Sequence, residues 1–118
     1  MSAAEPHPRR GQLYWVQIPD EPGAKRRPAL VVSPDVRNRL ANDVIVDPLS
    51  SVLHEAPTEV RLRAREGGLP SPSMAKCEQI TTVRRDRLVP RPLGSHLASA
   101  RMGEIEKAVL RAIGVPIA

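Results

Sequence analysis

Short apolar stretches alternate with turn-forming residues along most of this chain, which is the pattern of a protein built from strands. Residues 12–18 are rich in β-favouring side chains, and residues 19–23 have strong turn chemistry. Residues 28–33 are apolar and β-branched, which predicts a short strand buried on both faces. The first third of the sequence therefore predicts two strands and a loop between them.

A third strand is expected after a loop at residues 34–41, which contains Asn38. The apolar run at 44–46 continues to Leu49 through Pro48. Because proline has no backbone N–H to give to a neighbouring strand, Pro48 demands a strand end, a sheet edge or a bulge. Irregular backbone is therefore predicted at the end of this strand.

The pattern of short strands continues beyond residue 57. Residues 58–63 alternate between polar and apolar side chains, which predicts a half-exposed strand with its charged face outward. A turn cluster at 67–72 separates it from another expected strand at 73–83. The proline-broken stretch at 87–93 is a candidate for a final short strand.

Only the C-terminal segment has the spacing of a helix. One face is apolar and carries Met102, Ile105, Val109, Leu110 and Ile113. Gly114 and Pro116 are expected to end this helix, and Ser95 or Ser99 to cap its start. Several short strands with one amphipathic helix predict a compact, mostly β, barrel-like α+β domain.

The length of 118 residues is that of one domain with a single hydrophobic core. Residues 1–9 are polar and punctuated by proline, so we expect a flexible N-terminal tail followed by a single domain at residues 10–118. Hydrophobic residues make up 41% of the chain, which excludes a mostly disordered protein.

The net charge of +5 favours a polyanionic partner, without choosing between RNA, DNA and an acidic protein. Aromatic residues make up only 2% of the chain, too few for a surface that stacks successive bases on rings. The single cysteine, Cys77, fits a reducing compartment. With no signal-like N-terminus and no apolar run of membrane length, the expected location is the cytoplasm and no membrane contact is predicted.

Few residues have a pattern that indicates catalysis. His7, His54, His96 and Cys77 lack metal-ligand spacing, so no metal site and no cofactor are predicted. Cys77 in an apolar strand is typical of an inert core residue. A pair of histidines acting as acid and base would need His54 and His96 to converge, which nothing in their spacing indicates.

The basic triplet Lys25-Arg26-Arg27 stands immediately before a predicted buried strand. Arg27 precedes Pro28, which restricts its backbone, and a strand root holds a guanidinium more rigidly than a free loop. Arg27 is therefore a candidate phosphate clamp. The competing interpretation is that Arg26 and Arg27 are ordinary solvated surface charges.

Several segments, in order, resemble one protein family, the MazF/PemK toxins. These segments are residues 10–16, which open with Arg-Gly; 27–34, which open with Arg-Pro; 44–46 with 48–51; 77–80, which read Cys-Glu-Gln-Ile; and the C-terminal helix. Together they span nearly the whole predicted domain. The resemblance implies a small SH3-like or CcdB-like barrel with a C-terminal amphipathic helix, assembled as a homodimer.

The same resemblance implies an endoribonuclease, an mRNA interferase that acts as the toxin of a toxin–antitoxin pair. Such an enzyme cuts single-stranded RNA at a short sequence by attack of the ribose 2′-hydroxyl, leaving a 2′,3′-cyclic phosphate and a 5′-hydroxyl, without a metal. The matching catalytic positions are Arg27 and Ser50, where relatives usually carry threonine. Gln79 matches a strand residue beside the family's active site.

Further RNA contacts are expected around these positions. Lys25 and Arg26 are predicted to follow the RNA backbone, although the loop at 19–25 lacks the Gly-Ser-Glu sequence of many relatives. The remaining candidates for base or phosphate contacts, each of which can also be a simple turn residue, are Ser51, Ser73 and Asn38.

The resemblance also implies a partner, a MazE-like antitoxin whose acidic tail would cover the active-site groove, and a positive surface suits such a tail. Two other functions stay open at this point. One is a non-enzymatic protein on the same fold, either a gyrase-binding CcdB-like toxin or an RNA-binding barrel. The other is a relative that has lost activity, for which Ser50 and the shortened loop are the hints.

Overall fold

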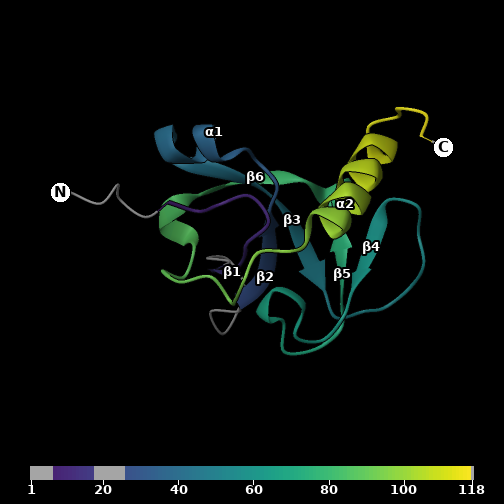
Figure 1. Cartoon of the computed structure of the whole chain (residues 1–118), viewed down its shortest axis with the longest axis horizontal. Coiled ribbons are helices and arrows are strands. Elements are labelled where there is room, and N and C mark those ends of the chain that lie inside the picture. Colours follow the sequence, from purple (N-terminus) through teal and green to yellow (C-terminus); the bar gives the residue numbers. More distant parts are fainter. Residues whose placement is uncertain (1–6, 18–25, 118) are drawn as a thin grey trace.

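The structure, a computed structural model, describes residues 7–17 and 26–117 and consists of a curved antiparallel sheet with a long helix against it (Figure 1). The strands are β1 (Leu13–Gln17), β2 (Arg26–Val31), β3 (Asp43–Ser50), β4 (Glu59–Leu62), β5 (Ser73–Lys76) and β6 (Thr81–Arg84). Their order is β1-β2-β3-β5-β4, with β6 pairing β3. The predicted strands at 12–18, 28–33, 44–49 and 58–63 are confirmed.

Strand β3 is long enough to change partners on one side. It pairs with β2 along one edge, whereas the other edge pairs with β6 through residues 43–46 and with β5 through Leu49 and Ser50. Asp47 and Pro48 fall between these two ladders. The strand does not end at Pro48. This proline instead lies where β3 has no partner strand on the edge that it shares with β6 and β5. A proline is tolerated there because no neighbouring strand requires its missing N–H.

The two faces of the sheet bury separate apolar clusters. The first cluster lies between the sheet and the helix α2 (Ser99–Ala112) and includes Leu13, Leu30, Leu62, Ile105 and Ala108. The second lies on the opposite face and consists of Tyr14, Val16, Ala29, Val31, Val44, Val46 and Leu88, with Val83 packed against them. Tyr14 is the one aromatic member of the two clusters, because the chain has so few aromatic residues.

The edge of β1 is covered by the chain that follows β6. Leu88 forms a single bridge with Val16, and the backbone N–H groups of Val89 and Leu93 donate to the carbonyls of Trp15 and Leu13. The sheet is thus barrel-like without being closed by strand pairing, and the strand considered for 87–93 is reduced to one bridge. Covering an edge in this way removes a surface for unwanted strand addition.

Three local predictions are wrong. The expected loop at 34–41 contains a helical turn, α1 (Asp35–Leu40), whose acidic residue lies in its first turn. The expected single strand at 73–83 is divided into β5 and β6 by a 3₁₀ turn, η2 (Cys77–Gln79). Neither Ser95 nor Ser99 caps α2, whose N-cap residue is Ala98 and makes no side-chain cap.

The ends of the chain follow the sequence more closely. Gly114 adopts φ +89° just beyond α2 and ends it as predicted, leaving Ile113 outside the helix with 64% exposure. At the other end, Pro8 is buried against the rest of the domain. No helix within the described ranges is long and apolar enough to cross a bilayer.

Candidate active site

The register of the central strands decides which predicted site residues share a face of the sheet. Ala29 pairs with Pro48, and Arg27 pairs with Val16 on the neighbouring strand. Continuing the β2–β3 register by two residues places Arg27 opposite Ser50, just beyond the last paired residues. Since directly opposed residues point to the same side of a sheet, both side chains belong to one face.

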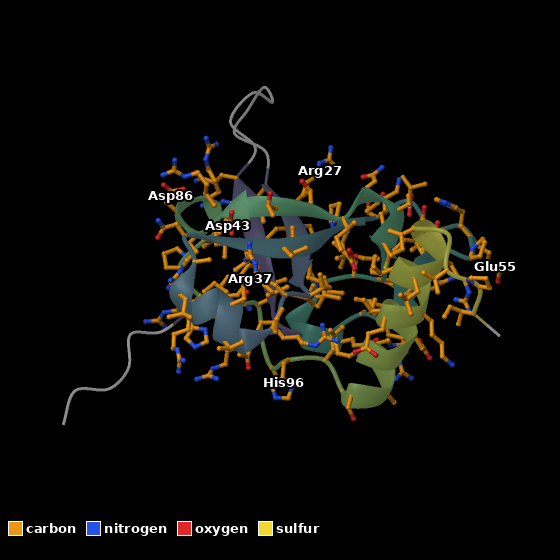
Figure 2. The ribbon with its side chains drawn as sticks, turned by 90° about the horizontal axis from the view of Figure 1, so that it is seen from above. Arg27, Arg37, Asp43, Glu55, Asp86 and His96 are labelled. Atoms are coloured by element: carbon orange, nitrogen blue, oxygen red, sulfur yellow. The ribbon has the colours of Figure 1, made fainter. Side chains whose placement is uncertain are left out.

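Arg27 is exposed at the N-terminal end of β2, at the rim of the molecule (Figure 2). Beside it is a pocket of about 210 Å³ whose lining includes Arg26, Arg27, Ser51 and Ser73. The structure therefore brings four of the predicted RNA-contacting residues to one hollow. Two guanidinium groups with two hydroxyls at one pocket can hold an oxyanion such as a phosphate.

Ser50 is half-buried at the C-terminal end of β3, where the strand leaves the sheet. Its Oγ accepts a hydrogen bond of 3.1 Å from the backbone N–H of Val52, which fixes the side-chain rotamer and leaves the hydroxyl proton able to donate elsewhere. Ser50 pairs with Met74 across β5. Its hydroxyl lies next to, and does not line, the pocket beside Arg27.

The other residues predicted to contact RNA differ in how far the structure exposes them. Gln79 is exposed, but it lies in the 3₁₀ turn η2 instead of in a strand. Ser73 is 4% exposed and its hydroxyl donates to the carbonyl of Ser71 at 3.2 Å. Lys25 lies outside the described residues.

Asn38 does not have the surface position that an RNA contact requires. It is fully buried, its amide N–H donates to the Ser33 carbonyl at 2.9 Å, and its Oδ1 accepts from the Ser33 hydroxyl at 2.5 Å. The Ser33 hydroxyl oxygen in turn accepts from the N–H of Ile45. Asn38 therefore ties α1 to the sheet, and we withdraw it from the predicted RNA contacts.

The sequence did not indicate a second pocket of about 520 Å³, formed where residues 53–57 pass over β4 and β5. Its walls include Leu53, Met74 and Arg61, together with His54 and Glu59. His54 does not meet His96; its partner is Glu59, whose Oε1 lies 3.1 Å from His54 Nε2. The alternation of polar and apolar residues in β4 indicates that Glu59 and Arg61 share one face of the strand. It does not indicate that residues 53–57 lie over that face.

The side chain of Glu59 is 4% exposed, and its buried Oε1 lies beside His54 Nε2. Burial, and then hydrogen bonding to Glu78, raise the pKa of Glu59. Glu78 is exposed; the slight desolvation of its carboxyl would raise its pKa, but hydrogen bonding with Glu59 and Thr58 lowers the pKa. The two opposite shifts mean that a proton shared between these carboxyls favours Glu59 over Glu78.

A further carboxyl, Asp47, lies in the gap of β3 between its two partner strands. Asp47 is fully buried, neither of its oxygens has a hydrogen-bond partner in the described structure, and burial raises its pKa to about 6. The neighbouring Cys77 is buried as well, and burial followed by the charge of Asp47 raises the pKa of its thiol. A thiol with a raised pKa is unreactive, which agrees with the prediction of an inert Cys77.

Comparison with known proteins places this geometry in a family. The model of the PemK-like, MazF-like toxins of type II toxin–antitoxin systems matches residues 9–113. The chain belongs to this family. A curated relative, endoribonuclease MazF9 of Mycobacterium tuberculosis, is 33% identical over 110 residues, covering 86% of this chain and 92% of the relative. Endoribonuclease EndoA of Bacillus subtilis is 28% identical over 106 residues, covering 86% and 90%.

Solved structures of the MazF/PemK family have the same fold. An endoribonuclease from a mycobacterial species, in complex with its cognate antitoxin, superposes with a TM-score of 0.76 at 30% identity, covering 94% of this chain and 99% of that one. The barrel-like sheet with a C-terminal helix is thus the fold of a MazF-like toxin, and endoribonuclease is the enzyme class of the named relatives. The expectation of family and fold drawn from the sequence motifs is confirmed.

Proposed function

We propose that this MazF-like toxin is an endoribonuclease that cuts single-stranded RNA at a short sequence without a metal ion. In the reaction, the ribose 2′-hydroxyl loses its proton as its oxygen bonds to the adjacent phosphorus, and the bond from phosphorus to the 5′-oxygen breaks as that oxygen gains a proton. The products are a 2′,3′-cyclic phosphate and a 5′-hydroxyl. The observation that carries this proposal is the β2–β3 register, which assigns Arg27 and Ser50 to one face of the sheet.

Arg27 has the properties needed to stabilise the transition state. Its guanidinium can place a fixed positive charge and two N–H donors on the phosphate oxygens as negative charge builds on them. A guanidinium resists deprotonation, so we assign Arg27 to electrostatic stabilisation and not to the role of base. Ser50 can donate one more hydrogen bond, from a hydroxyl already oriented by the Val52 N–H.

The test uses a long RNA, excess EDTA and the purified protein, with the ends of the fragments mapped. We expect cuts that carry a cyclic phosphate. Substitution of Arg27→Ala should slow cleavage by roughly 10²–10³-fold, the usual effect of removing one donor to a developing oxyanion. Ser50→Ala should slow it by a smaller factor, whereas Ser50→Thr should preserve it because the hydroxyl remains.

A matched control is Arg39→Ala, which removes an exposed arginine from α1. It should leave the cleavage rate close to that of the unmodified protein, and all variants should unfold at similar temperatures. Cleavage that requires a metal, or that survives Arg27→Ala, would overturn the proposed mechanism. Intact RNA that is nevertheless bound would favour an RNA-binding barrel.

We also propose a homodimer and a MazE-like antitoxin as partners. The mycobacterial relative described above was solved with its cognate antitoxin. A net charge of +5 suits an acidic segment laid across the exposed arginines around Arg27. Occupation of this face by the antitoxin would exclude RNA from Arg27 and Ser50.

A further inference from the structure

A pocket of about 570 Å³ lies at the covered edge of β1. Two segments form its walls: the chain that enters β1 from residue 7, and residues 85–92, which follow β6 (Figure 1). A bridge between Val16 and Leu88 holds the second segment against β1. The volume is within the range of about 300–1,000 Å³ that is usual for small-molecule sites. None of the residues that line this pocket lines the pocket beside Arg27.

The charged groups in this pocket are cations. Three arginines and one histidine line it, namely Arg9, Arg85, Arg91 and His7, whereas no acidic side chain of the described residues does. Arg9 lies 3.9 Å from Asp35, but both side chains are at least half exposed, so this pair neutralises little of the charge. The pocket is therefore suited to an anion.

Gln12 and Tyr14 also line the pocket. The Tyr14 hydroxyl donates to Gln12 Oε1 at 3.0 Å, and the backbone N–H of Arg9 donates to the same oxygen at 2.8 Å. Because this oxygen already has two donors, the amide N–H groups are what Gln12 offers to a ligand. Burial raises the pKa of Tyr14, whereas the positive charges of Arg85 and Arg9 act in the opposite direction. Both guanidinium groups therefore lie within electrostatic reach of the Tyr14 hydroxyl.

Prolines restrict the backbone that carries two of these arginines. Arg91 stands between Pro90 and Pro92, and all three residues line the pocket. Arg9 follows Pro8, which is buried. A proline fixes its own φ angle and restricts the residue before it, so this backbone loses little further freedom when a ligand binds. The proline rings also give an apolar wall beside the charges, against which a planar ring can pack.

We propose that this pocket binds a nucleoside di- or triphosphate, with the phosphates at the arginines and the base against the proline rings. Adjacent phosphates bring several negative charges to one hollow, and each guanidinium can bind two phosphate oxygens. An acidic peptide fits less well, because successive side chains of an extended chain point in opposite directions. The pocket shares no residue with the proposed cleavage site, so its occupation does not depend on RNA being cut.

The first experiment titrates ATP into the full chain while the methyl NMR signals of Leu88 and Val89 are followed. ATP should shift both signals, and tripolyphosphate should compete with it. Adenosine, which lacks the phosphates, should bind at least tenfold more weakly than ATP. Arg9→Ala and Arg91→Ala should each weaken ATP binding roughly tenfold, the usual loss when a hydrogen bond to a charged group is removed. No shift by ATP, or equal binding of adenosine, would overturn the proposal.

The matched control is Arg84→Ala, which removes a positive charge next to Arg85 in the sequence. The Arg84 side chain is 73% exposed and does not line the pocket, so the affinity for ATP should not change. Arg9 and Arg91 are exposed as well, so all three variants should unfold at similar temperatures. An equal loss of ATP binding in Arg84→Ala would reveal a general effect of charge and reject the site.

A second experiment separates the nucleotide from other anions and from the cleavage site. The Arg27→Ala variant should bind ATP with unchanged affinity; a loss would place ATP at the cleavage site and contradict the proposal. In this variant, neither a 2′-O-methyl RNA without terminal phosphates nor a hexaglutamate peptide should displace ATP at equal concentration. Displacement by the RNA would make the pocket part of the RNA path, and displacement by the peptide would make it a site for an acidic segment. Either result would overturn the nucleotide proposal and leave the nuclease proposal in place.

Discussion

Asp47 is a carboxyl in a position that suits an apolar side chain. It is fully buried in the gap of β3, with neither oxygen hydrogen-bonded to a described residue. Burial raises its pKa from 3.8 to about 6, because the low-polarity surroundings disfavour the charged form. The folded protein therefore holds this proton at pH values where the unfolded chain has released it.

We expect a stability loss between about pH 4 and about pH 7 that Asp47→Asn abolishes. Below the unfolded pKa both states are protonated and Asp47 has no effect. As the pH rises towards the folded value of about 6, the unfolded chain releases the proton first, so the free energy of unfolding falls by roughly 3 kcal/mol. The measurement is denaturant unfolding over this pH range.

The quantity to compare is the change of the unfolding free energy with pH. The absolute stability is not informative, because the asparagine amide would itself be buried without hydrogen-bond partners. Asp86→Asn is the control: that side chain is 60% exposed and paired with Arg84, so its variant should retain the pH slope of the unmodified protein. A slope that Asp47→Asn leaves unchanged would show that Asp47 is not the group responsible.

At the scale of elements, two glycines show how position decides the effect of the same substitution. Gly68 has φ +89°, and a Cβ there would lie 2.3 Å from the carbonyl oxygen of Leu93. Gly103 lies within α2, and a Cβ there would meet nothing within 4 Å. The first glycine is required by a close approach of two backbones, and the second only weakens a helix.

Gly103→Ala should therefore raise the free energy of unfolding by about 0.5–1 kcal/mol, the difference in helix propensity. Gly68→Ala should lower it by more than about 1 kcal/mol, because both the φ angle and the space forbid a side chain. Denaturant unfolding of the pair measures both effects. Equal and small changes would contradict the packing of Leu93 against Gly68.

At two places the boundaries of the observed elements differ from those that the sequence pattern predicts, because contacts with the rest of the fold decide them. Residues 73–83 read as one strand, but Cys77–Gln79 form a 3₁₀ turn because β3 offers no strand partner at Asp47 and Pro48. The helix α1 at residues 35–40 has few apolar residues, and its buried member is Asn38, held by Ser33. Its hydrogen bonds to the sheet are not visible in a one-dimensional pattern.

At the scale of the whole molecule, an apolar groove of about 430 Å³ runs between α2 and the sheet. Its lining includes Val32, Ile45, Ile80, Val109 and Leu110. Exposed apolar surface of this kind is typical of an interface. It supports the homodimer that the family resemblance implies, with a second copy on this groove.

We expect a particle of about twice the 12.9 kDa chain mass in light scattering. Ile80→Asp should shift it to the monomer mass, because a charge in an apolar interface is costly to bury. Val36→Asp alters an α1 residue that is 60% exposed and outside the groove, and it should remain dimeric. A monomer in the unmodified protein, or an Ile80→Asp dimer, would exclude this interface.

Much of this protein was determined by the sequence alone. The alternation at 58–63, the β-branched run at 28–33 and the amphipathic spacing of 102–110 predicted their elements, because each pattern reflects a single face buried against a core. The ordered motifs around Arg27, Ser50 and Gln79 indicated the MazF/PemK family, which was confirmed. Local patterns and motif order are properties of the chain itself, so they need no structure.

Only the tertiary structure decided which side chains meet. Register places Arg27 and Ser50 on one sheet face and brings Met74 and Arg61 into line with them. The fold of the loop before β4 sets His54 Nε2 3.1 Å from Glu59 Oε1. These pairings join residues that are distant in the chain through strand order and packing, and no spacing along a single sequence encodes either of them.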